Sequence, residues 1–149
     1  MRTTLTVAVV AGLAVGCGSA ASAPTPSPSG SGQDTTLRIS YWSEGNDELK
    51  TSDQPDKQWT LRCDPAAGSL PKDVEACRKL KAMKRPFAPP RKDVQCTQEY
   101  GGPQEAVITG TYLGSRIFAR LSLTDSCQIT RFKRLGFLIP GVRVSAPGS

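Results

Sequence analysis

The sequence predicts a small α+β domain that follows an N-terminal export segment. Several short stretches alternate apolar and polar residues, as half-buried strands do. One stretch instead repeats apolar residues at helical spacing, and cysteines are spread among these segments. The length of 149 residues corresponds to about one domain.

The N-terminus is typical of an exported protein. A positively charged start precedes an apolar stretch over residues 5–15. This stretch is too short to span a bilayer, but it fits the core of a signal peptide.

The end of this apolar stretch leaves two ways of processing open. Gly16 and Cys17 resemble the end of a bacterial lipobox, which implies a signal peptide over residues 1–16 and a diacylglyceryl-modified Cys17. The alternative is an ordinary signal peptide cleaved after Ala20 or Ala23, with Cys17 discarded. We prefer lipidation, which would anchor an exported protein at the cell surface.

Residues 17–35 are rich in Ser, Pro, Gly and Ala. Such a segment cannot bury a core, so we expect a disordered tether. The folded domain then covers residues 36–140, and residues 141–149 form a tail.

Within the domain, residues 37–41 and 59–63 alternate as strands and flank a polar loop. A turn at Asp64, Pro65 and Gly68 follows the second strand. Three later stretches, residues 106–111, 116–123 and 135–139, are also expected to be strands. Leu113-Gly114-Ser115 fits a hairpin turn between the first two of these.

A helix is predicted between the second and third strands. Pro71 suits its first turn, and Pro86 ends it. Val74, Cys77, Leu80 and Met83 recur at three-residue steps and are expected to form its buried face. The proline-rich residues 87–92 should then be extended or irregular.

Composition and charge restrict the function. The chain has 19 Lys and Arg against 13 Asp and Glu, a net charge of +6, and no histidine. Without an imidazole there is no Ser–His or Cys–His nucleophile pair and no His-ligated zinc. This removes the usual designs of an active site but does not exclude an enzyme. An enzyme is the least favoured of the functions considered, and we expect no metal and no cofactor. A basic run between residues 78 and 92 is interpreted as a solvated surface, and no nucleic-acid partner is expected for an exported chain without stacking aromatics nearby.

Four cysteines remain once Cys17 is set aside: Cys63, Cys77, Cys96 and Cys127. An even number in an exported chain predicts two disulfides. Four cysteines allow three connectivities, and their spacing does not choose among them.

The segments around these cysteines form a recognisable series. WTLRCDP begins at residue 59, a helix bearing Cys77 follows, VQCTQEY begins at residue 94, and GTYLGSRIFARLSLTDSC begins at residue 110. Together they resemble the Streptomyces subtilisin inhibitor family over residues 37–139. The resemblance implies a five-stranded antiparallel sheet with two helices and the disulfides Cys63–Cys77 and Cys96–Cys127. It also implies a homodimer packed through the sheet and inhibition of subtilisin-like serine proteases.

By the same resemblance, Cys96 and Tyr100 place the reactive bond at Gln98–Glu99, with Thr97 just before it. Gln98 would enter the primary specificity pocket of the protease. A rigid loop inhibits because the new amine stays beside the acyl-enzyme and the bond re-forms. Rigidity also lowers the ordering cost of binding, and a disulfide at Cys96 would supply it.

Two departures from the family pattern lead to an alternative function. Gln98 stands where Met, Lys or Arg is frequent, and Gly101-Gly102-Pro103 replaces Asp-Pro with one residue added, which would loosen the far side of the loop. The alternative is a lipid-anchored binding or structural protein on the same fold, without inhibitory activity. We prefer the inhibitor, with membrane contact only through the lipid anchor.

Overall fold

The computed structural model describes residues 34–46 and 54–142. The expected signal peptide, Cys17, most of the tether and most of the tail lie outside the described residues. Within them the elements are, in order, β1 (Thr35–Trp42), β2 (Lys57–Cys63), β3 (Ala67–Gly68), α1 (Asp73–Ala82), β4 (Glu105–Tyr112), β5 (Ser115–Leu121), α2 (Ser126–Leu135) and the 3₁₀ helix η1 (Gly136–Leu138). No helix in these two ranges combines the length and apolarity needed to cross a bilayer.

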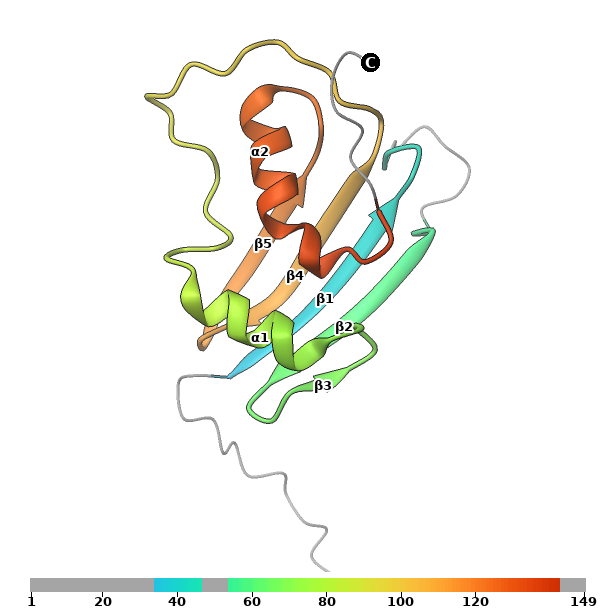
Figure 1. The fold of residues 1–149 in the computed structure, drawn as a ribbon, viewed down its shortest axis with the longest axis vertical. Helices are drawn as coiled ribbons and strands as arrows, with labels where there is room; N and C mark the ends of the chain where they lie inside the picture. Colours follow the sequence, from blue (N-terminus) through green and yellow to red (C-terminus); the bar gives the residue numbers. More distant parts are fainter. Residues whose placement is uncertain (1–33, 47–53, 143–149) are drawn as a thin grey trace, which may run out of the picture.

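The five strands form one antiparallel sheet in the order β3-β2-β1-β4-β5. Both helices lie on the same face of this sheet, with α1 across its β2 and β3 side and α2 over β4 and β5 (Figure 1). Among residues 34–46 and 54–142, no helix lies on the opposite face. The expected α+β fold, with a five-stranded antiparallel sheet and two helices, is confirmed.

Alternation along the strands decides which side chains are buried. In β1, Leu37, Ile39 and Tyr41 are buried towards the helices, whereas Thr36 and Arg38 are exposed on the other face. The same alternation runs through the paired strands, so the apolar halves of all four long strands meet the helices. The core joins these side chains to Leu61, Leu80, Ile108, Leu121, Leu123, Ile129, Phe132, Leu135, Leu138 and Ile139.

The predicted helix between β2 and β4 is present, but its buried face differs from the prediction. Val74 is 68% exposed, and the residues buried against the sheet are Ala76, Cys77 and Leu80. The helix begins at Asp73, so Val74 lies in its first turn on the solvent side. Ala76 and Leu80 lie four residues apart on one helical face, and this spacing sets the contact.

The predicted strand over residues 135–139 is wrong. Leu135 is the last residue of α2, and the 3₁₀ helix η1 follows directly. The apolar run continues a helical stripe that begins with Ile129 and Phe132, three residues apart and both buried. Asp125 starts this helix, because its carboxylate accepts a hydrogen bond from the Gln128 N–H at 2.9 Å.

The fifth strand is instead the two-residue β3, at a position predicted to be a turn. Gly68 has a φ of +136° and pairs with Leu61 of β2. Ser69 adds side-chain contacts, because its Oγ accepts from the Thr60 N–H at 2.9 Å. This short edge strand borders β2 beside α1.

Both disulfides have the expected partners. Cys63–Cys77 joins the end of β2 to α1 with a Cα–Cα distance of 5.8 Å, and Cys96–Cys127 joins the α1–β4 connection to α2 at 5.4 Å. Loop-closure entropy gives each a contribution of about 3–4 kcal/mol to the free energy of unfolding.

Gly110 offers a test of the register between β1 and β4. Its φ is +130°, and a Cβ there would lie 2.1 Å from the carbonyl oxygen of Thr36 on β1. Gly110→Ala is therefore expected to lower the free energy of unfolding by about 2 kcal/mol or more, measured by urea denaturation.

Gly136 is the matched control, because it has a φ of −57° and nothing within 4 Å of an added Cβ. Gly136→Ala should leave stability unchanged or raise it by up to about 1 kcal/mol. Equal effects of the two substitutions would contradict the register described above.

Candidate functional site

The candidate site lies on the connection between α1 and β4, called here the α1–β4 loop (residues 83–104). In Figure 1 this yellow segment runs outside the helices and over the end of the sheet where β4 begins. Residues 91–98 are all exposed. The segment is therefore accessible to a macromolecule along most of its length.

Two arginines of α2 hold the first part of the loop. Arg131 donates to the carbonyl oxygens of Arg120 on β5, at 2.7 Å, and of Phe87, at 2.9 Å. Arg134 donates to the carbonyl oxygen of Pro86 at 3.0 Å. Burial lowers the pKa of Arg131 from its ordinary value, and the nearby charge of Arg134 adds to this shift. The guanidinium groups thus fix the point at which the loop leaves the helical layer.

The loop is attached to α2 a second time at Cys96 and Thr97. The Cys96–Cys127 disulfide reaches the first turn of α2. Next to it, the Thr97 N–H donates to Ser126 Oγ at 2.9 Å, and the Ser126 N–H donates to the Thr97 carbonyl at 3.1 Å. Both backbone polar groups of Thr97 are thus bound to one residue of the helix terminus.

The chain turns sharply at Gln98. The Glu99 N–H donates to the Thr97 carbonyl at 2.9 Å, which closes a three-residue turn around Gln98. Gln98 does not have a positive φ, so this is the common inverse form of the turn. The exposed side chain of Gln98 follows directly after the attached Thr97, and Glu99 is partly buried.

The far side of the loop is attached at Gly101. Its N–H donates to the Leu123 carbonyl at 2.8 Å, and a Cβ at this position would lie 3.1 Å from Ile129 Cδ1. Tyr100, just before it, is 66% exposed. The first glycine of Gly101-Gly102-Pro103 thus allows a close approach to α2 and a backbone hydrogen bond. The expectation that this replacement loosens the far side of the loop stays a prediction.

Sequence reasoning placed Cys96 to Tyr100 in one exposed loop but missed the residues that support them. Ser126, Leu123 and the two arginines of α2 were not identified. Ser126 lies 29 residues from Thr97 in sequence. Its position next to Cys127 is the available signal, because a disulfide brings the neighbours of both cysteines together.

The same region could suggest a metal site. Cys96, Asp125 and Cys127 offer ligand atoms within 4.8 Å of one another. Both sulfur atoms are already joined in the disulfide, and metal binding needs thiolates. With the disulfide formed, Cys96 and Cys127 join the loop to α2 and offer no thiolate to a metal.

Comparison with known proteins assigns the chain to a family. A family model described as subtilisin inhibitor-like matches residues 33–122, which include β1 to β5 and the α1–β4 loop. Among solved structures, the chain is similar to Streptomyces caespitosus sermetstatin, crystallised in complex with Bacillus licheniformis subtilisin. That match has a TM-score of 0.46 and 18% identity, and it covers 73% of this chain and 99% of that chain. No curated protein in the comparison matches the chain. Since the family model matches more than half of its length, the chain belongs to the subtilisin inhibitor-like family.

Proposed function

We propose that the chain is a substrate-like inhibitor of subtilisin-like serine proteases, with Gln98–Glu99 as the reactive bond. Family membership supports the inhibitor class. The observation that carries the assignment of the bond is the double attachment of Thr97 to Ser126, directly before an exposed Gln98.

This attachment suits the way in which proteases bind substrates. An enzyme that takes an extended peptide as an added strand uses the backbone groups of alternate residues. The backbone N–H and carbonyl of Thr97 are bound to Ser126 within the inhibitor. In contrast, the N–H groups of Cys96 and Gln98 make no hydrogen bond with the described residues. Those two residues are therefore available to the enzyme while Thr97 holds the loop in shape.

The two attachments also explain how hydrolysis would be suppressed. Attack of the protease serine on the Gln98 carbonyl breaks the bond to the Glu99 nitrogen and gives an acyl-enzyme and a free amine. The acyl side stays tied to α2 through Thr97 and Cys96, and the amine side stays tied through Gly101. Because both ends are held, the amine remains at high effective concentration and the peptide bond re-forms.

Gln98 also determines which proteases are inhibited. The specificity pocket of trypsin ends in a carboxylate that a cation neutralises, so a neutral amide leaves this charge unpaired. An unpaired buried charge costs several kcal/mol of binding free energy. The broader pocket implied for subtilisin accepts the side chain, so subtilisin should be inhibited far better than trypsin.

We also propose that the protein is exported and anchored by lipidation of Cys17. The apolar stretch before Gly16 and Cys17 supports this, and so do two disulfides, which persist in oxidising compartments. The acyl chains of a diacylglyceryl group are enough for stable anchoring.

Gln98→Lys is expected to create trypsin inhibition, because it places a cation on a loop that is already attached on both sides. Titration of trypsin activity measures the effect, and a gain of about 100-fold or more in affinity is expected. Gln95→Lys is the matched control, because Gln95 is exposed on the same loop but lies three residues earlier. It should not inhibit trypsin.

A folded Gln98→Lys variant that still fails against trypsin, and that Glu99→Ala does not rescue, would show that this bond is not the reactive site. If the unchanged chain also fails to inhibit subtilisin, the alternative function, a binding or structural protein without inhibitory activity, would be supported instead.

Ser126→Ala is expected to make the chain a weaker inhibitor that subtilisin cleaves faster, because it removes the oxygen that accepts a hydrogen bond from the Thr97 N–H. The inhibition constant for subtilisin should rise about tenfold, the value of one hydrogen bond, and cleavage at residue 98 should accelerate. Ser122→Ala is the control, since the Ser122 hydroxyl forms a hydrogen bond only with the Thr124 hydroxyl among the described residues. Equal inhibition constants for the two variants would contradict this role of Ser126.

Cys17→Ser is expected to move the protein from the membrane fraction to the medium. The measurement is immunoblotting of both fractions after a high-salt wash, which removes peripheral electrostatic binding. Unchanged membrane association under these conditions would refute the lipid anchor.

A further inference from the structure

The chain segment that follows β1 lies beside the α1–β4 loop. β1 ends at Trp42, which pairs with Glu105, the first residue of β4. The chain therefore leaves β1 at the end of the sheet where the α1–β4 loop enters β4 (Figure 1). Residues 44–46 are named here the β1 exit segment. The two segments are close, because a Cβ on Gly45 would lie 3.0 Å from the carbonyl oxygen of Pro103.

Both segments line one depression next to the proposed reactive bond. This open depression of about 330 Å³ has residues 44–46 on one side and Tyr100, Gly102 and Pro103 on the other. Tyr100 is the second residue after the Gln98–Glu99 bond and is 66% exposed. The surface on the leaving-group side of the bond thus continues onto the β1 exit segment.

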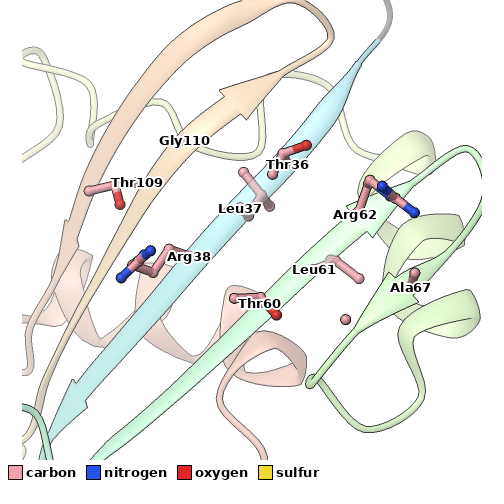
Figure 2. Close-up of a pocket in the computed structure, with 10 residues that line it drawn as sticks. Thr36, Leu37, Arg38, Thr60, Leu61, Arg62, Ala67, Thr109 and Gly110 are labelled. Atoms are coloured by element: carbon pink, nitrogen blue, oxygen red, sulfur yellow. The ribbon is translucent and has the colours of Figure 1, made fainter. Parts of the chain in front are cut away.

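Another depression, of about 530 Å³, lies on the sheet away from this bond. Figure 2 shows Arg38, Thr60 and Arg62 beside it. Its lining residues belong to β1, β2, β3 and β4, and none of the described ones belongs to the α1–β4 loop. It therefore does not continue the proposed contact with the protease, whereas the depression at Tyr100 does.

A buried ion pair fixes the β1 exit segment. Glu105 is 7% exposed, and its carboxylate accepts from Arg120 Nε and, at 3.0 Å, from Arg120 Nη2. Asn46 joins this pair through its backbone. Its N–H donates to Glu105 Oε2 at 3.4 Å, and its carbonyl accepts from Arg120 Nη2 at 3.4 Å. Because a bidentate pair of this kind has a defined geometry, it also defines where Asn46 lies.

The stability of the sheet does not by itself require this pair. Replacing a buried ion pair by packed apolar side chains of similar volume is often neutral or stabilising. Apolar side chains at Glu105 and Arg120 would, however, offer neither an acceptor nor a donor to the backbone of Asn46. The specific contribution of the pair is therefore the position of the β1 exit segment.

The usual size of a protease–inhibitor contact requires more than the exposed loop. Such interfaces involve roughly 20–30 residues on each partner. Residues 91–100 alone are too few for this, so neighbouring segments must also touch the enzyme. On the leaving-group side of the bond, the β1 exit segment is the neighbour that shares a surface with Tyr100.

We propose that the β1 exit segment is a second contact with the protease, on the leaving-group side of the reactive bond, and that Glu105 and Arg120 position it. This inference rests on the proposed inhibitory function. The exposed side chain of Glu44 would meet the rim of the enzyme's cleft beside the site taken by Tyr100. Because the segment does not enter the specificity pocket, it would distinguish between proteases that share the same pocket.

Photo-cross-linking of the full chain to subtilisin tests the contact. The photoreactive residue p-benzoylphenylalanine replaces Glu44 in one variant, Tyr100 in a second and Arg78 in a third. Tyr100 is the positive control beside the reactive bond, and Arg78 is the negative control, exposed on α1. Positions 44 and 100 are expected to cross-link to subtilisin, and position 78 is not. An excess of the unchanged chain should abolish both cross-links.

Arg120→Lys tests the positioning role. Lysine keeps the charge, but its single nitrogen replaces the fork that reaches both Glu105 and the Asn46 carbonyl. The inhibition constant for subtilisin should rise about tenfold, the value of one hydrogen bond. Cleavage at residue 98 should not accelerate, because the attachments of Thr97 and Gly101 do not involve the Arg120 side chain.

Two further variants accompany this measurement. Glu105→Gln removes the charge of the other partner and is expected to raise the inhibition constant in the same way. Glu75→Gln is the control, since it removes a different pair, with Lys79 on α1 at 2.8 Å, and should leave the inhibition constant unchanged. Circular dichroism verifies that each variant is folded.

The possible failures are distinguishable. A cross-link from position 100 without one from position 44 would overturn the second contact and leave the proposed inhibition intact. Cleavage that accelerates in Arg120→Lys as much as the inhibition constant rises would show that the pair holds the α1–β4 loop instead of the β1 exit segment. An unchanged chain that neither inhibits subtilisin nor allows a cross-link from position 100 would overturn the inhibitory function, and this inference with it.

Discussion

The site depends on how α2 is held against the sheet. Ile129, Phe132 and Leu135 are buried in the core, and this contact holds the helix from its second turn to its C-terminal end. Its N-terminal turn then holds the loop through Ser126 and Cys127, while Arg131 and Arg134 hold the start of the loop. A loop with little packing of its own thus takes its shape from a helix that is well packed.

Much of the fold could be predicted from the sequence, because alternation is a local signal. The four long strands are predicted from stretches such as residues 37–41 and 59–63. The structure extends the first three by one to three residues, whereas β5 begins one residue earlier and ends two residues earlier than predicted. The short apolar run at residues 135–139 was misread because periodicity cannot separate a short strand from the end of a helix. The two-residue β3 has no sequence pattern at all and exists because Gly68 can pair with Leu61 at positive φ.

The residues of the candidate loop could be predicted from the sequence, but the residues that hold the loop in place could not. The disulfide partners followed from the resemblance, and the loop residues followed from Cys96. The bonds of Thr97 to Ser126 and of Gly101 to Leu123 join segments far apart in the chain. Such contacts depend on where α2 lies on the sheet, and local patterns carry no information about that position.

The attachments on either side of Gln98 share one property. Thr97 is held through its backbone N–H and carbonyl groups and Gly101 through its N–H, and no side chain from residue 97 to residue 100 takes part in these bonds. The side chains of Thr97, Gln98 and Tyr100, which would contact a protease in the proposed complex, thus take no part in attaching the loop. Substitutions at these three positions could therefore change which enzymes the domain binds, with little effect on the stability of its fold.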